Sequence, residues 1–201
     1  MGSSETLLQW ISDLVGRIVG SRPTGDPTEY VGLVPTPAND GLWVLKRSGD
    51  IHSFANARDF REVPDPQPWK ANPFVALAAT PSGLGLWLLR SSGDVVSFGD
   101  APDFREVPQP VPWKTNPFVA LAATPGGDGL WLLRTSGDVL AFGDASDFSQ
   151  RLETVGAGAN PFVAMAATVN GKGLWALRGS GEVVPIGNAP RTDESSTLDA
   201  R

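Results

Sequence analysis

Cysteine is absent from the 201 residues, so the chain holds neither a disulfide bond nor a thiolate metal site. A cysteine-free chain tolerates oxidising and reducing conditions alike, and the compartment therefore stays open on this count. Long apolar runs are also missing. The segment Phe74 to Ala79 is typical, and no run approaches the length that spans a membrane. The first residues lack the cationic start of a secretion signal, so we expect no cleavable signal peptide.

Basic side chains are scarce. Sixteen lysines and arginines stand against 22 acidic residues, which gives a formal net charge of −6. No local cluster of basic residues reverses that sign, and such a chain repels a phosphate backbone, so nucleic acid is not an expected partner. The sequence has no glycine-rich phosphate loop and no Gly-x-Ser-x-Gly nucleophile motif. We therefore expect no enzymatic activity and no cofactor.

What the sequence does have is a repeat with a period of 44 residues. The segment 74–80 recurs at 118–124 and, with one change, at 162–168. Tyr30 lies one period before Phe74 and begins the first unit. Two further motifs keep the same register. Gly-Leu-Trp begins at residues 41, 85, 129 and 173, and Ser-Gly followed by an acid begins at 48, 92, 136 and 180. The chain therefore contains four equivalent units.

Each unit predicts three strands, which in the second unit are 74–80, 86–90 and 95–98. The first strand is apolar on both faces, which indicates burial on both sides. Ser92-Gly93 is typical of a tight hairpin turn between the second and third strands. A fourth and weaker candidate strand is 104–107, half polar as an outer edge strand would be.

Units of this length with antiparallel strands predict an all-β fold, namely a four-bladed β-propeller. We assign the propeller to residues 30–189, with units 30–73, 74–117, 118–161 and 162–189. The fourth unit is short, so its outer strand is absent or comes from another segment. An open arc of blades would leave sheet edges exposed, and we therefore predict one ring closed within the chain.

The segment Gly85 to Ala101 resembles the tandem tryptophan repeats with the pattern SDGGVFSFGDA found in actinobacterial surface proteins and in phages of those hosts. The resemblance covers Tyr30 to about Ala189 and implies a propeller-like fold. In architecture the chain is similar to hemopexin-like four-bladed propellers. It departs from the repeat pattern in the first and last units, where Ala55-Asn56 and Gly187-Asn188 replace Gly-Asp.

Residues 1–20 predict one amphipathic α-helix, running from Glu5 to Val19, followed by a linker at 21–29. Its apolar stripe follows a heptad pattern. The stripe consists of Leu7, Leu8, Trp10, Ile11, Leu14, Val15 and Ile18. One interpretation is that this helix caps an end of the propeller. The interpretation that we favour is an interface, through which the chain associates with itself or docks into a larger assembly. Residues 190–201 are polar and read as a solvated tail.

Candidate chemistry is limited. His52 is the single histidine, and one histidine on a strand is a weak candidate for a catalytic base. The pairs Asp100 with Asp103 and Asp144 with Asp147 offer oxygen ligands of the kind that calcium takes. Their spacing does not match that of an EF-hand loop, so we assign no metal site and expect hydrogen bonds within local turns.

The tryptophans fall into two classes. Those of the Gly-Leu-Trp motif, Trp43, Trp87, Trp131 and Trp175, are expected in the core. Trp69 and Trp113 follow prolines in the links between units and are candidate ligand-binding residues, because exposed aromatic rings stack on sugars. The alternative is that each ring fills a gap between blades.

These features predict a non-enzymatic structural protein, a rigid propeller displayed on a larger assembly through its N-terminal helix. The repeat type, together with the expected lack of a signal peptide, favours a virion component, a minor tail or capsid-associated protein of an actinobacterial phage. A position on the extracellular surface is the other expected location. The alternative function is a lectin-like module that binds cell-wall or surface glycan. Expected partners are other proteins, with glycan and a second copy as further candidates.

Overall fold

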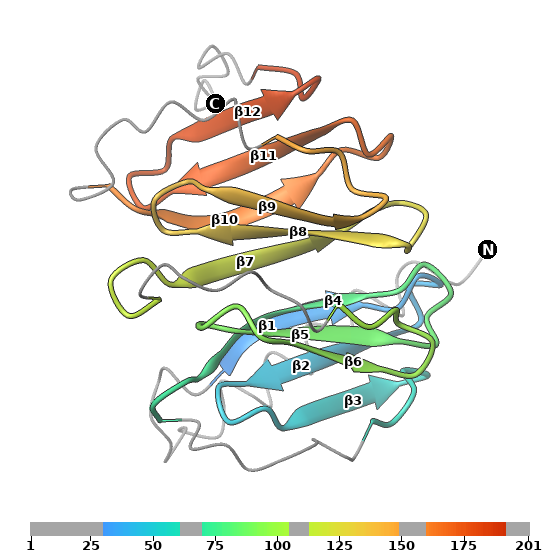
Figure 1. Cartoon of the computed structure of the whole chain (residues 1–201). Helices are drawn as coiled ribbons and strands as arrows, with labels where there is room; N and C mark the ends of the chain where they lie inside the picture. Colours follow the sequence, from blue (N-terminus) through green and yellow to red (C-terminus); the bar gives the residue numbers. More distant parts are fainter. Residues whose placement is uncertain (1–29, 61–69, 105–112, 149–159, 192–201) are drawn as a thin grey trace, which may run out of the picture.

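The computed structural model describes residues 30–60, 70–104, 113–148 and 160–191, and this part of the chain is built from β-strands (Figure 1). Its twelve strands are β1 (Tyr30–Pro35), β2 (Gly41–Lys46), β3 (Ile51–Ala55), β4 (Phe74–Ala79), β5 (Leu86–Arg90), β6 (Val95–Phe98), β7 (Phe118–Ala123), β8 (Gly129–Arg134), β9 (Val139–Gly143), β10 (Phe162–Ala167), β11 (Gly173–Arg178) and β12 (Val183–Gly187). The described ranges include no helix long and apolar enough to cross a membrane. The predicted helix, the linker and all but the first two residues of the tail lie outside the described residues.

The strands form four antiparallel sheets of three strands each, and each sheet is one repeat unit. We call them blade 1 (β1–β3), blade 2 (β4–β6), blade 3 (β7–β9) and blade 4 (β10–β12). The three predicted strands of each unit are therefore confirmed, and in blade 2 their bounds differ from the prediction by one residue. The weaker fourth strand is not formed at Phe104, and residues 105–107 lie outside the described part.

A glycine turn joins the second strand of each blade to the third. The amide of Gly93 donates to the carbonyl of Arg90 at 2.9 Å, and Gly93 has a φ of 104°, in the left-handed region that favours glycine. The equivalent glycines of the other three blades have φ between 93° and 103°. The Ser-Gly-acid motif therefore fixes the register of each hairpin, as the sequence predicts.

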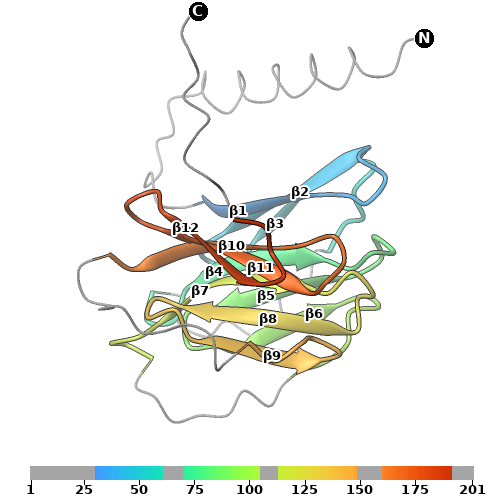
Figure 2. The same ribbon diagram turned by 90° about the horizontal axis from the view of Figure 1, so that it is seen from above.

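The four blades follow one another in an open arc. The first strand of each blade contacts the first strand of the next, so that β1 lies beside β4, β4 beside β7 and β7 beside β10. Between β1 and β10 there is no contact. In Figure 1 blades 3 and 4 lie in the upper half of the view and blades 1 and 2 in the lower half, and Figure 2 shows the same blades from above.

The prediction of a ring closed within one chain is therefore wrong for the described residues. The 44-residue period determines how many blades form, whereas the angle between neighbouring blades is set by the side chains packed between them. In the structure, the fourth blade does not reach the first.

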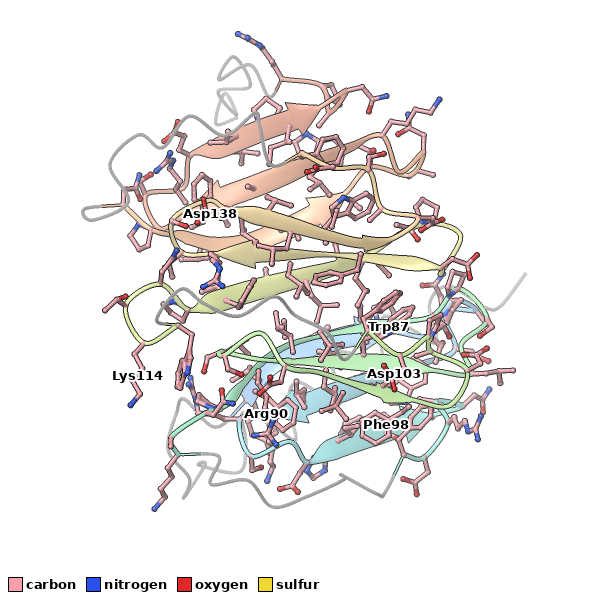
Figure 3. All side chains as sticks on the ribbon, in the orientation of Figure 1. Trp87, Arg90, Phe98, Asp103, Lys114 and Asp138 are labelled. Atoms are coloured by element: carbon pink, nitrogen blue, oxygen red, sulfur yellow. The ribbon has the colours of Figure 1, made fainter. Side chains whose placement is uncertain are left out.

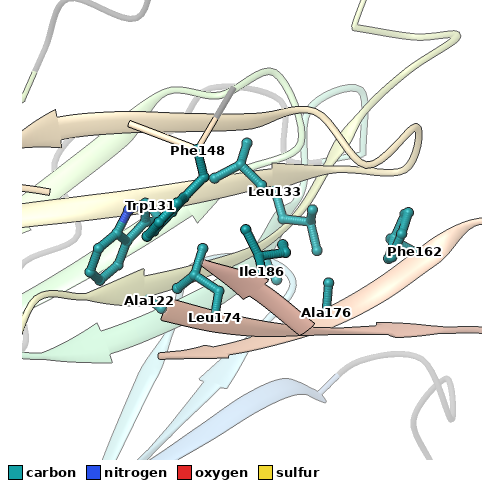
Figure 4. Close-up of a cluster of buried hydrophobic side chains, with 10 residues drawn as sticks. Ala122, Trp131, Leu133, Phe148, Phe162, Leu174, Ala176 and Ile186 are labelled. Atoms are coloured by element: carbon teal, nitrogen blue, oxygen red, sulfur yellow. The ribbon is translucent and has the colours of Figure 1, made fainter. Parts of the chain in front are cut away.

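Apolar layers between neighbouring blades make up the core. Between blades 3 and 4, Trp131, Leu133 and Phe148 face Phe162, Leu174 and Ile186 (Figure 4). Equivalent layers join blade 2 to blade 3 and blade 1 to blade 2. Trp43, Trp87 and Trp131 are fully buried in these layers, as the sequence predicts. Trp175 of blade 4 is only partly buried, because no fifth blade covers it.

Candidate interaction surfaces at the ends of the blade arc

Every blade has two different faces. The tryptophan face carries the Trp of the Gly-Leu-Trp motif, and the leucine face carries the Leu that precedes it. At each of the three junctions between blades, the tryptophan face of one blade packs on the leucine face of the next. The leucine face of blade 1 and the tryptophan face of blade 4 are the two end faces of the arc, and no other blade covers them.

The leucine end face exposes apolar side chains that the inner blades bury. Tyr30 is 51% exposed and Leu33 is 70% exposed. Their equivalents one period later, Phe74 and Leu77, are 0% and 9% exposed, because they pack against blade 1. Leu42 and Val44 of the same face are half-buried, and the equivalent leucines of blades 2 and 3 are fully buried.

The tryptophan end face shows the same contrast. Val163 is 45% exposed and Val169 is 96% exposed. Val163 corresponds to Val75 and Val119, which lie against the apolar layers between inner blades. Trp175 and Leu177 are partly buried, and the matching tryptophans and leucines of the other blades are fully buried.

Five large apolar side chains are exposed in the described part of the chain, and four of them belong to the end blades. The fifth, Leu84, lies in a turn of blade 2, where blades 1 and 3 carry Asp40 and Asp128. Exposed apolar side chains gathered on a face are typical of surfaces that bind protein. The end faces are therefore the candidate interaction surfaces.

His52 lies on the leucine end face. It is exposed on β3 opposite Val44, and its ring centroid is 6.4 Å from that of Tyr30. Val96, Leu140 and Val184 occupy the equivalent position in the other three blades. His52 therefore belongs to an end face and replaces an aliphatic contact residue.

Two of the four repeated aspartates, Asp100 and Asp144, bond side chains of another turn of the same blade and not of their own turn, which corrects the prediction of local bonds. Asp100 accepts hydrogen bonds from Thr80 at 2.9 Å and from Ser82 at 2.6 Å, and Asp144 accepts one from Thr124 at 2.7 Å. The bond from Ser82, with that from Thr80 and the charge of Arg58, keeps the pKa of Asp100 below its usual value. No group of three or more metal-ligating side chains occurs among the described residues. Figure 3 shows Asp103 and Arg90 at opposite ends of blade 2.

An open pocket of about 160 Å³ lies between blades 2 and 3 beside these turns, lined by Pro81, Asp100, Pro102 and Asp128 among others. The residue equivalent to Pro102 in blade 1 is Arg58, whose guanidinium donates to the Leu84 carbonyl at 3.2 Å across the junction of blades 1 and 2. Three polar side chains of the lining, Thr80, Ser82 and Asp100, are already hydrogen-bonded to one another.

Of the two candidate ligand-binding tryptophans, the structure describes Trp113. Trp113 is half-buried in the link before blade 3, and the Lys114 ammonium lies 6.0 Å from its ring centroid. Trp69 lies outside the described residues, as do the seven predicted interface residues of the N-terminal helix.

Sequence reasoning missed both end faces. The predicted closed ring would have left neither end of the blade series uncovered. A signal was available, because the end units keep apolar residues such as Leu33 and Val163 at positions that need a neighbouring blade.

Comparison with known proteins supports the fold. No protein-family model and no curated protein matches the chain. The structure is similar to the beta-propeller domain of Cps50 (Swd1) from Myceliophteria thermophila, with a TM-score of 0.50 and 11% identity, over 80% of this chain and 54% of that one. It is also similar to the C-terminal WD40 domain of Sif2, with a TM-score of 0.51 and 10% identity, over 86% of this chain and 51% of that one. The chain thus has the fold of a β-propeller and spans about half the length of these propellers.

Proposed function

We propose that this chain is a non-catalytic scaffold that works by binding protein through the two end faces of its blade arc. The observation that carries the proposal is the difference in burial between equivalent positions. Leu33 is 70% exposed and Leu77 is 9% exposed, although the two residues occupy the same position in their repeat units. An apolar side chain that the repeat buries in its inner blades is expected to be buried at the ends too, by a partner.

The recurring polar groups support a structural role, because the blades use them to hold their own turns. Asn116 accepts a hydrogen bond from the Ser136 amide at 3.0 Å and donates to the Ser136 hydroxyl at 2.9 Å. The indole of Trp131 donates to the Ser146 carbonyl at 2.8 Å. Groups that lock turns in this way make the blades a rigid body, and rigid bodies suit a scaffold.

The finer part of the proposal concerns the assembly that contains this scaffold. The tandem tryptophan repeat resembles those of actinobacterial surface proteins and their phages, which favours a component of a virion or of the cell surface. This part rests on the repeat alone. The apolar stripe of residues 5–19 would supply a further contact within such an assembly.

Glycan binding is the second candidate function, and Trp113 is the described residue that favours it. Its side chain is half-buried beside Lys114, so part of its surface remains accessible to a sugar. One such ring is a small surface compared with the two apolar end faces, so protein binding is the function that we favour.

A comparison of two matched variants tests the proposal. Leu33→Asp places a charge on the leucine end face, whereas Leu84→Asp changes the exposed leucine outside the end faces into the residue that blades 1 and 3 carry. We expect light scattering to show the wild type and Leu84→Asp at a mass above one chain of 21.2 kDa, and Leu33→Asp at one chain. If the wild type is itself a single chain without a bound protein, the proposal is wrong.

A further inference from the structure

We infer that the partner of the end faces is a second copy of this chain, and that the two arcs join head to tail in one ring of eight blades. The inference rests on the proposed function and adds the identity of the partner. Blade 4 of each copy would receive blade 1 of the other, so the two junctions between copies would be identical.

The end faces complement each other in the same way as the faces inside the chain. At all three internal junctions a tryptophan face meets a leucine face. The arc ends with one face of each kind, the leucine face of blade 1 and the tryptophan face of blade 4, and both blades are built on the same repeat pattern. A junction between two copies would therefore repeat a contact that the chain already makes three times.

The repeat register specifies which residues would meet. Leu77 of blade 2 packs in one layer with Trp43 and Leu45 of blade 1. One period before Leu77 is Leu33, and the residues of blade 4 equivalent to Trp43 and Leu45 are Trp175 and Leu177. Leu33 of one copy would therefore lie on Trp175 and Leu177 of the other, and all three side chains are partly or largely exposed in the single chain.

Backbone hydrogen bonds across the junctions point to the same pairing. The first residue of each following blade donates its amide to the turn of the preceding blade. Phe74 donates to Arg47, Phe118 to Ser91 and Phe162 to Thr135, each at 3.0 Å. The next pair in this series is the Tyr30 amide of one copy and the Gly179 carbonyl of the other.

The extent of the arc favours two copies over other numbers. The match covers 54% and 51% of the two propeller chains, so the arc corresponds to about half of each of these propellers. Two arcs then complete one ring and leave no open end face. Single-chain closure is excluded by the separation of β1 from β10. Residues 5–19, or another protein, are the other candidate occupants.

A cross-link between the copies can be designed from one recurring contact. At each internal junction a proline of one blade lies against a turn glycine of the next, so close that a side chain at Gly83 would place its Cβ 3.0 Å from the Pro37 ring. The equivalent residues at the ends are Val169 and Asn39. Asn39 has a φ of 55°, close to the 73° of Gly83, so its turn has the same left-handed shape.

The test mixes two full-length single variants, Asn39→Cys and Val169→Cys. The natural chain has no cysteine, so any disulfide must join the introduced residues. We expect a covalent dimer under mild oxidation in the mixture and in neither variant alone. The double variant should also form a dimer as its largest covalent species, because two bonds close the ring. A control mixture of Leu84→Cys with Val169→Cys should form no dimer.

Three results would overturn the inference. A ladder of covalent oligomers from the double variant would mean an open chain of arcs. An internally bridged monomer would mean a ring of four blades within one chain. No cross-link at all would mean that another occupant covers the end faces. In that last case the proposed function still stands if the wild type carries another bound protein that Leu33→Asp does not bind. The proposed function fails if the wild type is a monomer with no bound protein.

Discussion

Removal of a motif tryptophan should have different consequences in an inner blade and at the end of the arc. The ring of Trp87 is fully buried between blades 2 and 3, is stacked with Phe104 at 6.4 Å between centroids, and donates to the Pro102 carbonyl at 2.8 Å. Replacing a buried tryptophan by alanine costs about 3–5 kcal/mol, from lost burial and from the cavity that remains. For a domain of this size, Trp87→Ala should lower the melting temperature by roughly 10 °C.

Trp175 occupies the equivalent position of blade 4, and its indole donates to the Pro190 carbonyl at 3.0 Å. In a single chain its ring is partly exposed, so less apolar surface is lost on truncation and the cost should be about half as large. In the eight-bladed ring the partner covers Trp175, and its removal weakens the junction on both copies. The cost of Trp175→Ala should therefore rise with protein concentration, because association stabilises the folded chain by mass action.

Calorimetric melts of both variants at a low and a high protein concentration measure this difference. The cost of Trp87→Ala should be the same at both concentrations, which makes it the matched control. If Trp175→Ala costs as much as Trp87→Ala at the lowest concentration, where the copies separate, then a segment of the same chain covers blade 4. That result would refute the account of the end faces.

Other predictions concern single features of the chain. His52→Val should tighten self-association by about tenfold, because an aliphatic residue at this position fills each internal junction, and dilution monitored by light scattering measures it. Asp100→Asn should reduce the loss of stability on acidification. The lowered pKa of Asp100 means that its ionised form stabilises the fold above about pH 4, and that this stabilisation is lost as the pH falls through the folded-state pKa; acid unfolding curves show the change. Trp113→Ala should leave the melting temperature within a few degrees and should abolish any signal that the wild type gives on a glycan array. The double variant Ile11→Asp with Leu14→Asp should keep the β-rich circular dichroism of the blades, and a loss of higher assembly in it would support the docking helix.

The sequence predicts the blades well because their determinants are local. The Ser-Gly turn, the Gly-Leu-Trp strand and the apolar first strand each act within one unit, so the 44-residue period places all twelve strands correctly. The partners of Asp100 were not predictable in this way, because its carboxylate accepts from Thr80 and Ser82, which lie in another turn of blade 2.

The angle between blades was not predictable from the period, because it depends on how whole faces pack. Two strands that look alike in sequence, β2 and β5, therefore differ in surroundings: Leu86 is fully buried, whereas Leu42 is half-buried at the end of the arc. A histidine fits at position 52, where the other three blades carry an aliphatic residue, because no other blade of the chain covers that face.

A crystal structure of the full-length chain tests the central claim most directly. The account predicts two chains related by a two-fold axis in one ring of eight blades, with Leu33 of each chain against Trp175 of the other. A single chain whose end faces are covered by its own residues, or a four-bladed ring with β1 beside β10, would contradict it.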